Sequence, residues 1–64
     1  MEINEEADKY IDRFIESELT LIKINDEKYP KMKLKEALTN QLRERNLTQI
    51  IAYSFMGGLY LEKI

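Results

Sequence analysis

The chain has 64 residues, a formal net charge of −2 and a charged fraction of 34%. A chain this short forms at most one domain, residues 1–64, with a small core. It contains no cysteine and no histidine, which excludes disulfides and zinc sites built from thiolates or imidazoles. We therefore expect no metal and no cofactor. We also expect a homo-oligomer, because small domains without such cross-links often rely on a second copy.

The composition predicts a folded protein rather than a disordered tail, since 44% of the residues are hydrophobic. Apolar runs are far shorter than the roughly 18 residues that cross a bilayer. The acidic opening from Glu2 is unlike a signal or transit peptide. These features predict a cytoplasmic location and no membrane contact. The negative net charge argues against a generic binder of phosphate backbones.

Residues 3 to 17 show the spacing of an amphipathic helix. Apolar side chains recur at positions i, i+3, i+4 and i+7, as in Ala7, Ile11 and Phe14. The neighbouring arc of this helix carries a row of carboxylates, which we call the acidic stripe. Its members are Glu5, Asp8, Asp12 and Glu16.

The next two elements follow from composition and turn residues. Leu19–Ile24 is rich in β-branched residues and predicts a short strand, and Asn25 to Pro30 predicts a loop. A second helix is predicted for residues 31–45, where leucines recur every four positions from Leu34. Asn46 directly after a basic helix end is a stop signal.

The last segment allows two interpretations. As a hairpin, Gln49–Phe55 and Leu59–Ile64 are strands, and Gly57-Gly58 supplies the two central turn residues. That register places Phe55 opposite Tyr60, Tyr53 opposite Glu62 and Ile51 opposite Ile64. As a helix capped by Asn46, the segment would give an all-α helical hairpin or a fold like a helix-turn-helix. Its β-branched and aromatic residues would then surround the helix with no polar face, which favours the hairpin.

The favoured order is α-β-α-β-β, a small two-layer α+β domain with a C-terminal β-hairpin. This order is similar to a winged-helix domain that lacks one helix. The resemblance implies a nucleic-acid-binding module in which helix 31–45 enters the DNA groove and the hairpin forms the wing. The bases that would contact phosphates are Lys31, Lys33, Lys35, Arg43 and Arg45.

A second, shorter resemblance concerns helix-turn-helix proteins. Leu42–Gln49 resembles the entry to the second helix of phage-repressor-type proteins. The chain departs from that pattern at Ala52 and Tyr53, and no full polar recognition helix follows Gly58. We therefore do not assign the chain to this family.

No nucleophile stands in a recognisable catalytic motif, and the carboxylates lie on a helix face that we expect to be solvated. The sequence therefore predicts a protein that is not an enzyme. We expect a small regulatory or inhibitory protein that binds a protein partner. The predicted contact surface is the acidic stripe or the edge of the hairpin, where the last strand ends at Ile64.

Overall fold

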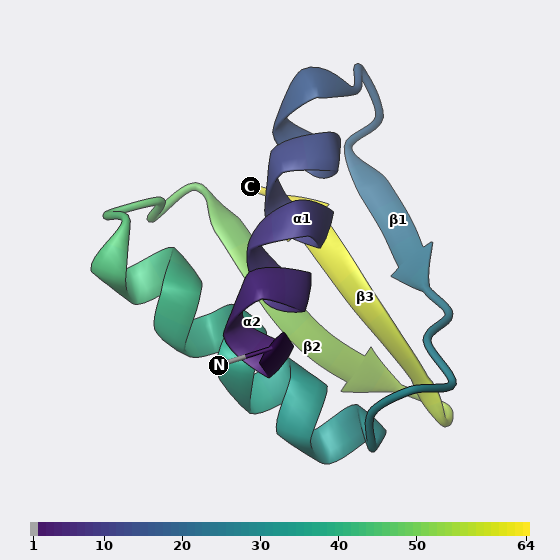
Figure 1. The fold of residues 1–64 in the computed structure, drawn as a ribbon. Coiled ribbons are helices and arrows are strands. Elements are labelled where there is room, and N and C mark those ends of the chain that lie inside the picture. The colour runs from purple at the N-terminus through teal and green to yellow at the C-terminus, as the bar shows by residue number, and fades with distance from the viewer. Residues whose placement is uncertain (1) are drawn as a thin grey trace.

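The computed structural model describes residues 2–64 and confirms the predicted α+β order. Its elements are drawn in Figure 1: α1 (Glu2–Glu16), β1 (Leu21–Ile24), α2 (Lys31–Glu44), β2 (Ile50–Phe55) and β3 (Gly58–Lys63). Within the described residues, no helix has both the length and the apolar character that a membrane crossing requires. The segment 47–56, for which a helix was the alternative, is not helical: Ile50–Phe55 form β2 and Met56 lies in the hairpin turn.

The three strands form one antiparallel sheet in the order β1-β3-β2. The prediction that the last strand presents a free edge is therefore wrong. Leu61 on β3 lies opposite Ile22 of β1 on one side and opposite Ala52 of β2 on the other. The physical reason is burial: Leu59 and Leu61 on β3 are almost completely buried, and the centre of a sheet removes most surface from water.

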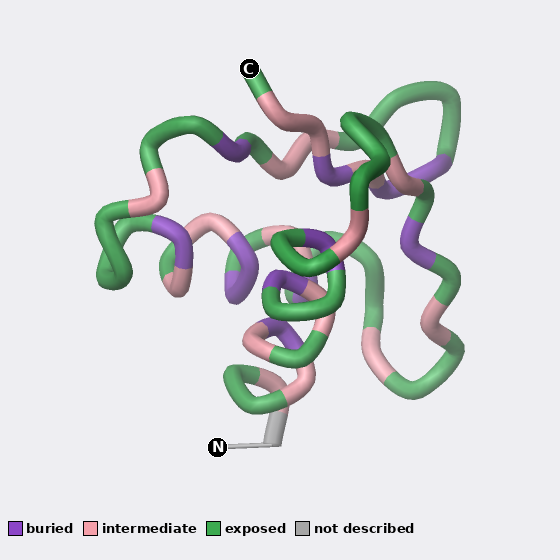
Figure 2. The backbone as a smooth tube through the Cα atoms, turned by 90° about the horizontal axis from the view of Figure 1, so that it is seen from above, coloured by how far each residue is buried: buried purple, intermediate pink, exposed green. Residues whose placement is uncertain are grey.

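Both helices pack on the same face of this sheet. Figure 2 shows the strands on one side of the molecule and the helices on the other. The core lies between these two layers. Its buried members are Ala7, Ile11, Phe14, Ile24, Leu34, Ala37, Leu38, Leu42, Ile50, Leu59 and Leu61. Helix α1 is also tied to β3, because the Lys63 ammonium lies 4.7 Å from the Phe14 ring centre and donates to the Ser17 carbonyl at 2.9 Å.

Helix α2 ends as its sequence predicts. Asn46 adopts a left-handed conformation with φ of 57°. The Leu47 N–H donates to the Leu42 carbonyl at 2.9 Å, and the Asn46 N–H donates to the Arg43 carbonyl at 3.1 Å. These two bonds form a Schellman motif, which satisfies the last helical carbonyls and turns the chain back towards the sheet.

The hairpin turn lies one residue earlier than predicted. Phe55 pairs with Gly58, so Met56 and Gly57 are the central turn residues, with φ of 50° and 79°. Tyr53 therefore faces Tyr60, and the predicted pairing of Phe55 with Tyr60 is wrong. The observed register stacks the two tyrosine rings with centres 5.6 Å apart, a contact that the predicted register would not make.

The side chain of Asp26 holds the loop before α2 in place. Its carboxylate accepts hydrogen bonds from the Tyr10 hydroxyl at 2.8 Å and from the N–H groups of Lys28 and Tyr29 at 2.7 and 3.2 Å. Burial alone raises the pKa of Asp26, but these three donors outweigh it and the pKa is lowered. Burial and the bond to Asp26 raise the pKa of Tyr10 to about 12. This contact fastens α1 to the loop.

We expect Met56→Asn to stabilise the fold by about 1 kcal/mol, because a side chain other than glycine is strained at positive φ and asparagine tolerates it best. Met56 is 89% exposed, so little packing is lost. Urea unfolding at low protein concentration measures the change. Met56→Ala, which keeps the strain, is the matched control and should leave stability unchanged; equal effects of the two variants would contradict the turn geometry.

We expect Tyr10→Phe to cost about 1 kcal/mol near neutral pH, because it removes a hydrogen bond to a charged acceptor. The lowered pKa of Asp26 means that its contribution is complete above the ordinary carboxyl pKa and is lost as the pH falls below that value, through the lowered pKa of the folded state. The difference between wild type and variant should therefore shrink below about pH 4.

The raised pKa of Tyr10 makes the stability depend on pH in the opposite direction at high pH. Its contribution is complete below the ordinary tyrosine pKa of 10.0 and is lost as the pH rises towards about 12. Urea unfolding of both proteins across the pH range measures both windows. A difference that is independent of pH would contradict the Tyr10–Asp26 contact.

Candidate protein-interaction surfaces

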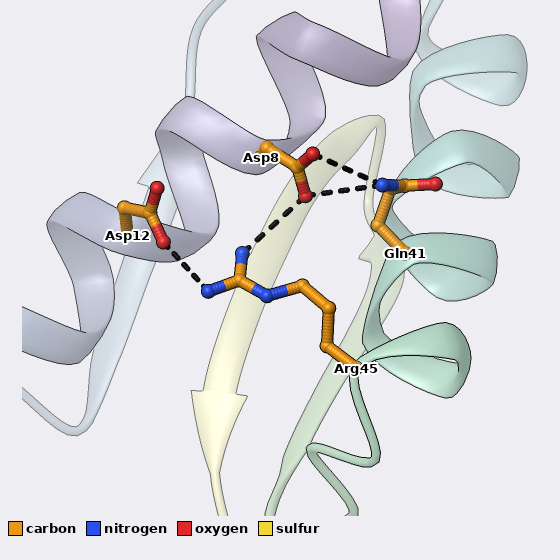
Figure 3. A network of polar contacts seen from close by, with 4 residues as sticks. All are labelled: Asp8, Asp12, Gln41 and Arg45. Carbon is orange, nitrogen blue, oxygen red and sulfur yellow. Dashed lines mark hydrogen bonds and ion pairs between the residues drawn. The ribbon is translucent and has the colours of Figure 1, made fainter.

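The centre of the acidic stripe faces α2 (Figure 3). The Asp8 carboxylate accepts hydrogen bonds from Gln41 Nε2 at 3.0 and 3.1 Å and from Arg45 Nη1 at 3.3 Å. Arg45 Nη2 donates to the Asp12 carboxylate at 2.8 Å. The bond to Asp12 raises the pKa of Arg45 further above its usual value. We call these four residues the α1–α2 clamp.

The clamp divides the acidic stripe. Asp8 and Asp12 contact side chains of the same chain, whereas Glu5 and Glu16 at the two ends are exposed. The stripe remains a predicted partner-binding surface. Its two central carboxylates share the single positive charge of Arg45, so Glu5 and Glu16 are the members best placed to reach another molecule.

The five predicted phosphate-binding bases have different environments. Arg45 belongs to the α1–α2 clamp, and Lys31 Nζ donates to the Gly57 carbonyl at the hairpin turn. Lys33 and Arg43 are exposed on α2, and Lys35 is half-buried. Helical geometry at about 100° per residue spreads these bases around α2 instead of placing them in one row. Their use by nucleic acid remains a prediction.

The sheet face turned away from both helices forms a third surface, which we call the outer face. Strand alternation places every second residue of each strand on it. Its members are Leu21, Lys23, Ile51, Tyr53, Phe55, Gly58, Tyr60 and Glu62. Five of these eight residues have large apolar or aromatic side chains, so this face has the composition of an interaction surface.

Exposure on the outer face is high for such residues. Leu21, Ile51 and Phe55 are 48%, 40% and 59% exposed. The sequence pattern favours core or hairpin-pair positions for five aromatic residues, Tyr10, Phe14, Tyr53, Phe55 and Tyr60. That is right for Phe14 and for the stacked tyrosines, but Phe55 has neither role, because it lies opposite Gly58 and projects into solvent.

Tyr60 lies flat on the outer face because Gly58 leaves room for it. A Cβ at Gly58 would lie 3.0 Å from the Tyr60 ring and 3.2 Å from the Lys23 side chain. Gly58 and the stacked rings of Tyr53 and Tyr60 thus lie together on the outer face. Partial burial and the neighbouring Glu62 carboxylate raise the pKa of Tyr53. Tyr53 is therefore a neutral hydroxyl at physiological pH.

Lys23 and Glu62 are the two charged members of the outer face, and they carry opposite charges. The face is therefore close to neutral. The sequence contains a signal for this apolar outer face, because both sets of alternating residues in β2 are largely apolar. Two short helices cover one side of a sheet, so one of these sets had to remain exposed.

Shallow hollows lie beside β2. One, of about 360 Å³, lies between α2 and β2 and includes Leu42, Leu47 and Ile50 in its lining. A larger one, of about 580 Å³, lies near the chain end between Ile15 and Ile64.

Within residues 2–64, no three potential metal ligands of the Asp, Glu, His or Cys type come together.

Comparisons of the chain with protein families, curated proteins and solved structures gave no match. The functional argument therefore rests on the surfaces described above.

A double-mutant cycle tests the α1–α2 clamp. We expect Asp12→Asn and Arg45→Met to show a coupling free energy of about 0.5 kcal/mol, typical of an accessible ion pair, that decreases as salt rises. The matched control replaces Arg45→Met by Arg43→Met on the same helix. Urea unfolding of the single and double variants gives the coupling. A coupling no larger than that of the Arg43 control would contradict the clamp.

Proposed function

We propose that this protein is a small non-enzymatic regulatory module that binds a protein partner through its outer face. The observation that supports the proposal is the exposure of Leu21, Ile51 and Phe55 beside the stacked tyrosines. Contiguous apolar patches on a small protein commonly mark interaction sites. Binding would act by occupying and covering a surface of the partner. The cytoplasmic location expected from the composition is part of this proposal.

The chemistry of the outer face narrows the type of partner. Aromatic residues are enriched at the centres of protein interfaces, where charged residues are depleted. Lys23 and Glu62 leave the face nearly neutral, so the partner surface should be apolar with few charges. The apolar side of an amphipathic helix has this character. The exposed carboxylates of Glu5 and Glu16 would then influence the rate of encounter more than the affinity.

Nucleic-acid binding has less support. Arg45 is balanced by two carboxylates, and Lys31 contacts the hairpin turn. The remaining bases, Lys33, Lys35 and Arg43, share their helix with Glu36 and Glu44. A phosphate-binding surface depends on concentrated positive charge, so we place protein binding first.

The test is affinity capture from cells that produce this protein, read by quantitative mass spectrometry. The outer-face variant is Ile51→Thr with Phe55→Thr. Both side chains are exposed, and threonine retains β propensity, so the fold should persist. We expect specific partners to be reduced at least tenfold, which matches the loss of an apolar anchor worth about 1.4 kcal/mol or more.

The matched control is Glu5→Gln with Glu16→Gln, which removes exposed charges of the acidic stripe and leaves the α1–α2 clamp intact. We expect this control to retain the partners. Retention by the outer-face variant together with loss in the control would move the binding surface to the acidic stripe. Substitution of Asp8 or Asp12 is less informative, because it would also break the clamp.

A further inference from the structure

The two edge strands of the sheet, β1 and β2, differ in how well they are protected against pairing with a strand of another chain. Strand β1 has four residues and carries Lys23, and a short, charged edge discourages pairing with another chain. Strand β2 has six residues, Ile-Ile-Ala-Tyr-Ser-Phe, with no charge, proline or glycine. A long uncharged edge strand is a template for a further strand.

The hairpin register identifies the backbone groups on the free edge of β2. Phe55 and Gly58 flank the two-residue turn and so form a hydrogen-bonded pair. The same alternation holds at the other end, where the Ile64 N–H donates to the Gln49 carbonyl at 2.7 Å. Odd-numbered residues of β2 therefore bond to β3, and the N–H and C=O groups of even-numbered residues point outward.

Three residues of β2 are even-numbered, and one of them already uses its donor. The Ile50 N–H donates to the Leu47 carbonyl at 3.4 Å. The register turns the N–H groups of Ala52 and Ser54 away from β3, and among residues 2–64 neither donates a backbone hydrogen bond outside the strand ladder. These two residues, separated by Tyr53, thus offer two donors and two acceptors along one stretch of edge.

We propose that β2 pairs antiparallel with β2 of a second copy of this chain, with the twofold axis passing beside Tyr53. Ala52 of each copy then exchanges two hydrogen bonds with Ser54 of the other. Tyr53 faces Tyr53, and Ile51 faces Phe55, as non-hydrogen-bonded pairs on the outer face. The four free groups on each edge are all satisfied.

Self-pairing is favoured because the edge is complementary to itself. The register centred on Ala52 instead would need the Ile50 N–H, which is already bonded to Leu47. The register centred on Tyr53 needs only the groups that are free. It also places Met56 of one copy opposite Ile50 of the other, beside the apolar hollow between Leu42 and Leu47. Met56 is 89% exposed in the isolated chain and gains an apolar neighbour there.

The resulting dimer has a continuous sheet of six strands. In Figure 1, β2 forms the border of the sheet opposite β1, so the two outer faces join into one surface. The contact is a strip one strand wide, which predicts a dimer at the weak end of protein interfaces. This inference rests on the backbone groups at the edge of β2, although Ile51, Tyr53 and Phe55 also belong to the outer face of the proposed function. The Ser54 variants below leave every outer-face side chain unchanged, so failure of the dimer and failure of partner binding can be told apart.

Cross-linking through an introduced thiol tests the register. The chain has no cysteine, so Tyr53→Cys creates a single thiol. At the axis, the two Cα atoms would be about 4.5 Å apart, which is within the range for a disulfide. We expect most of this variant to become a covalent dimer under mild oxidation, as seen on a non-reducing gel.

The matched control is Tyr60→Cys, on the same face but on the central strand. Three strand spacings separate the two copies there, about 14 Å, so we expect little covalent dimer. Cross-linking of Tyr60→Cys at least as efficient as that of Tyr53→Cys would overturn the proposal, because it indicates face-to-face or random association.

A second pair of variants tests the hydrogen bonds. Ser54→Pro removes a donor that points away from β3, so the hairpin ladder is kept, whereas Ser54→Ala keeps the donor. We expect Ser54→Pro to weaken dimerisation at least tenfold in sedimentation equilibrium, with far-ultraviolet circular dichroism unchanged, and Ser54→Ala to match wild type. A monomeric wild type at high concentration, or a dimer unaffected by Ser54→Pro, would overturn the proposal.

Discussion

The burial of Leu59 and Leu61 at the centre of the sheet is the constraint on which the rest of the structure depends. These side chains belong to the same buried cluster as residues of both helices, and their strand is paired on both edges. The chain has no cysteine, so no disulfide reinforces this packing. The core is thus a single layer between one sheet face and two helices, and each truncation in it should cost a large part of a small stability.

The polar contacts orient the helices around this core. The α1–α2 clamp joins the two helices, the Asp26 carboxylate joins α1 to the loop before α2, and Lys63 joins the end of α1 to β3. All three lie at least partly in water, so each contributes modestly. Together they favour one arrangement of the helices and the sheet. A small apolar core alone would specify that arrangement less strictly. The clamp also pairs Asp8 and Asp12 with Arg45, although the sequence pattern assigns these two carboxylates to partner binding.

The two candidate interaction surfaces have one structural origin. With two helices on one face, the other face of the sheet has no cover, and with β3 in the centre, β2 is left as an uncharged edge. The outer face offers side chains to a partner, whereas the β2 edge offers backbone groups to a second copy. Both would remove exposed apolar surface from water, which is the main driving force for association of a small domain.

The sequence alone determined the elements and the end of α2, because periodicity, β-branched content and Asn46 are local signals. It also indicated the hairpin through the pair Gly57-Gly58. It did not determine the position of the turn, because sliding the turn by one residue shifts the pairing by two and leaves every side chain on the same face. Only the tertiary structure decided the strand order β1-β3-β2, the contacts of Asp8 and Asp12 with side chains of the same chain, and the exposure of Phe55. Each depends on which elements meet in space, and no local pattern in the chain encodes that.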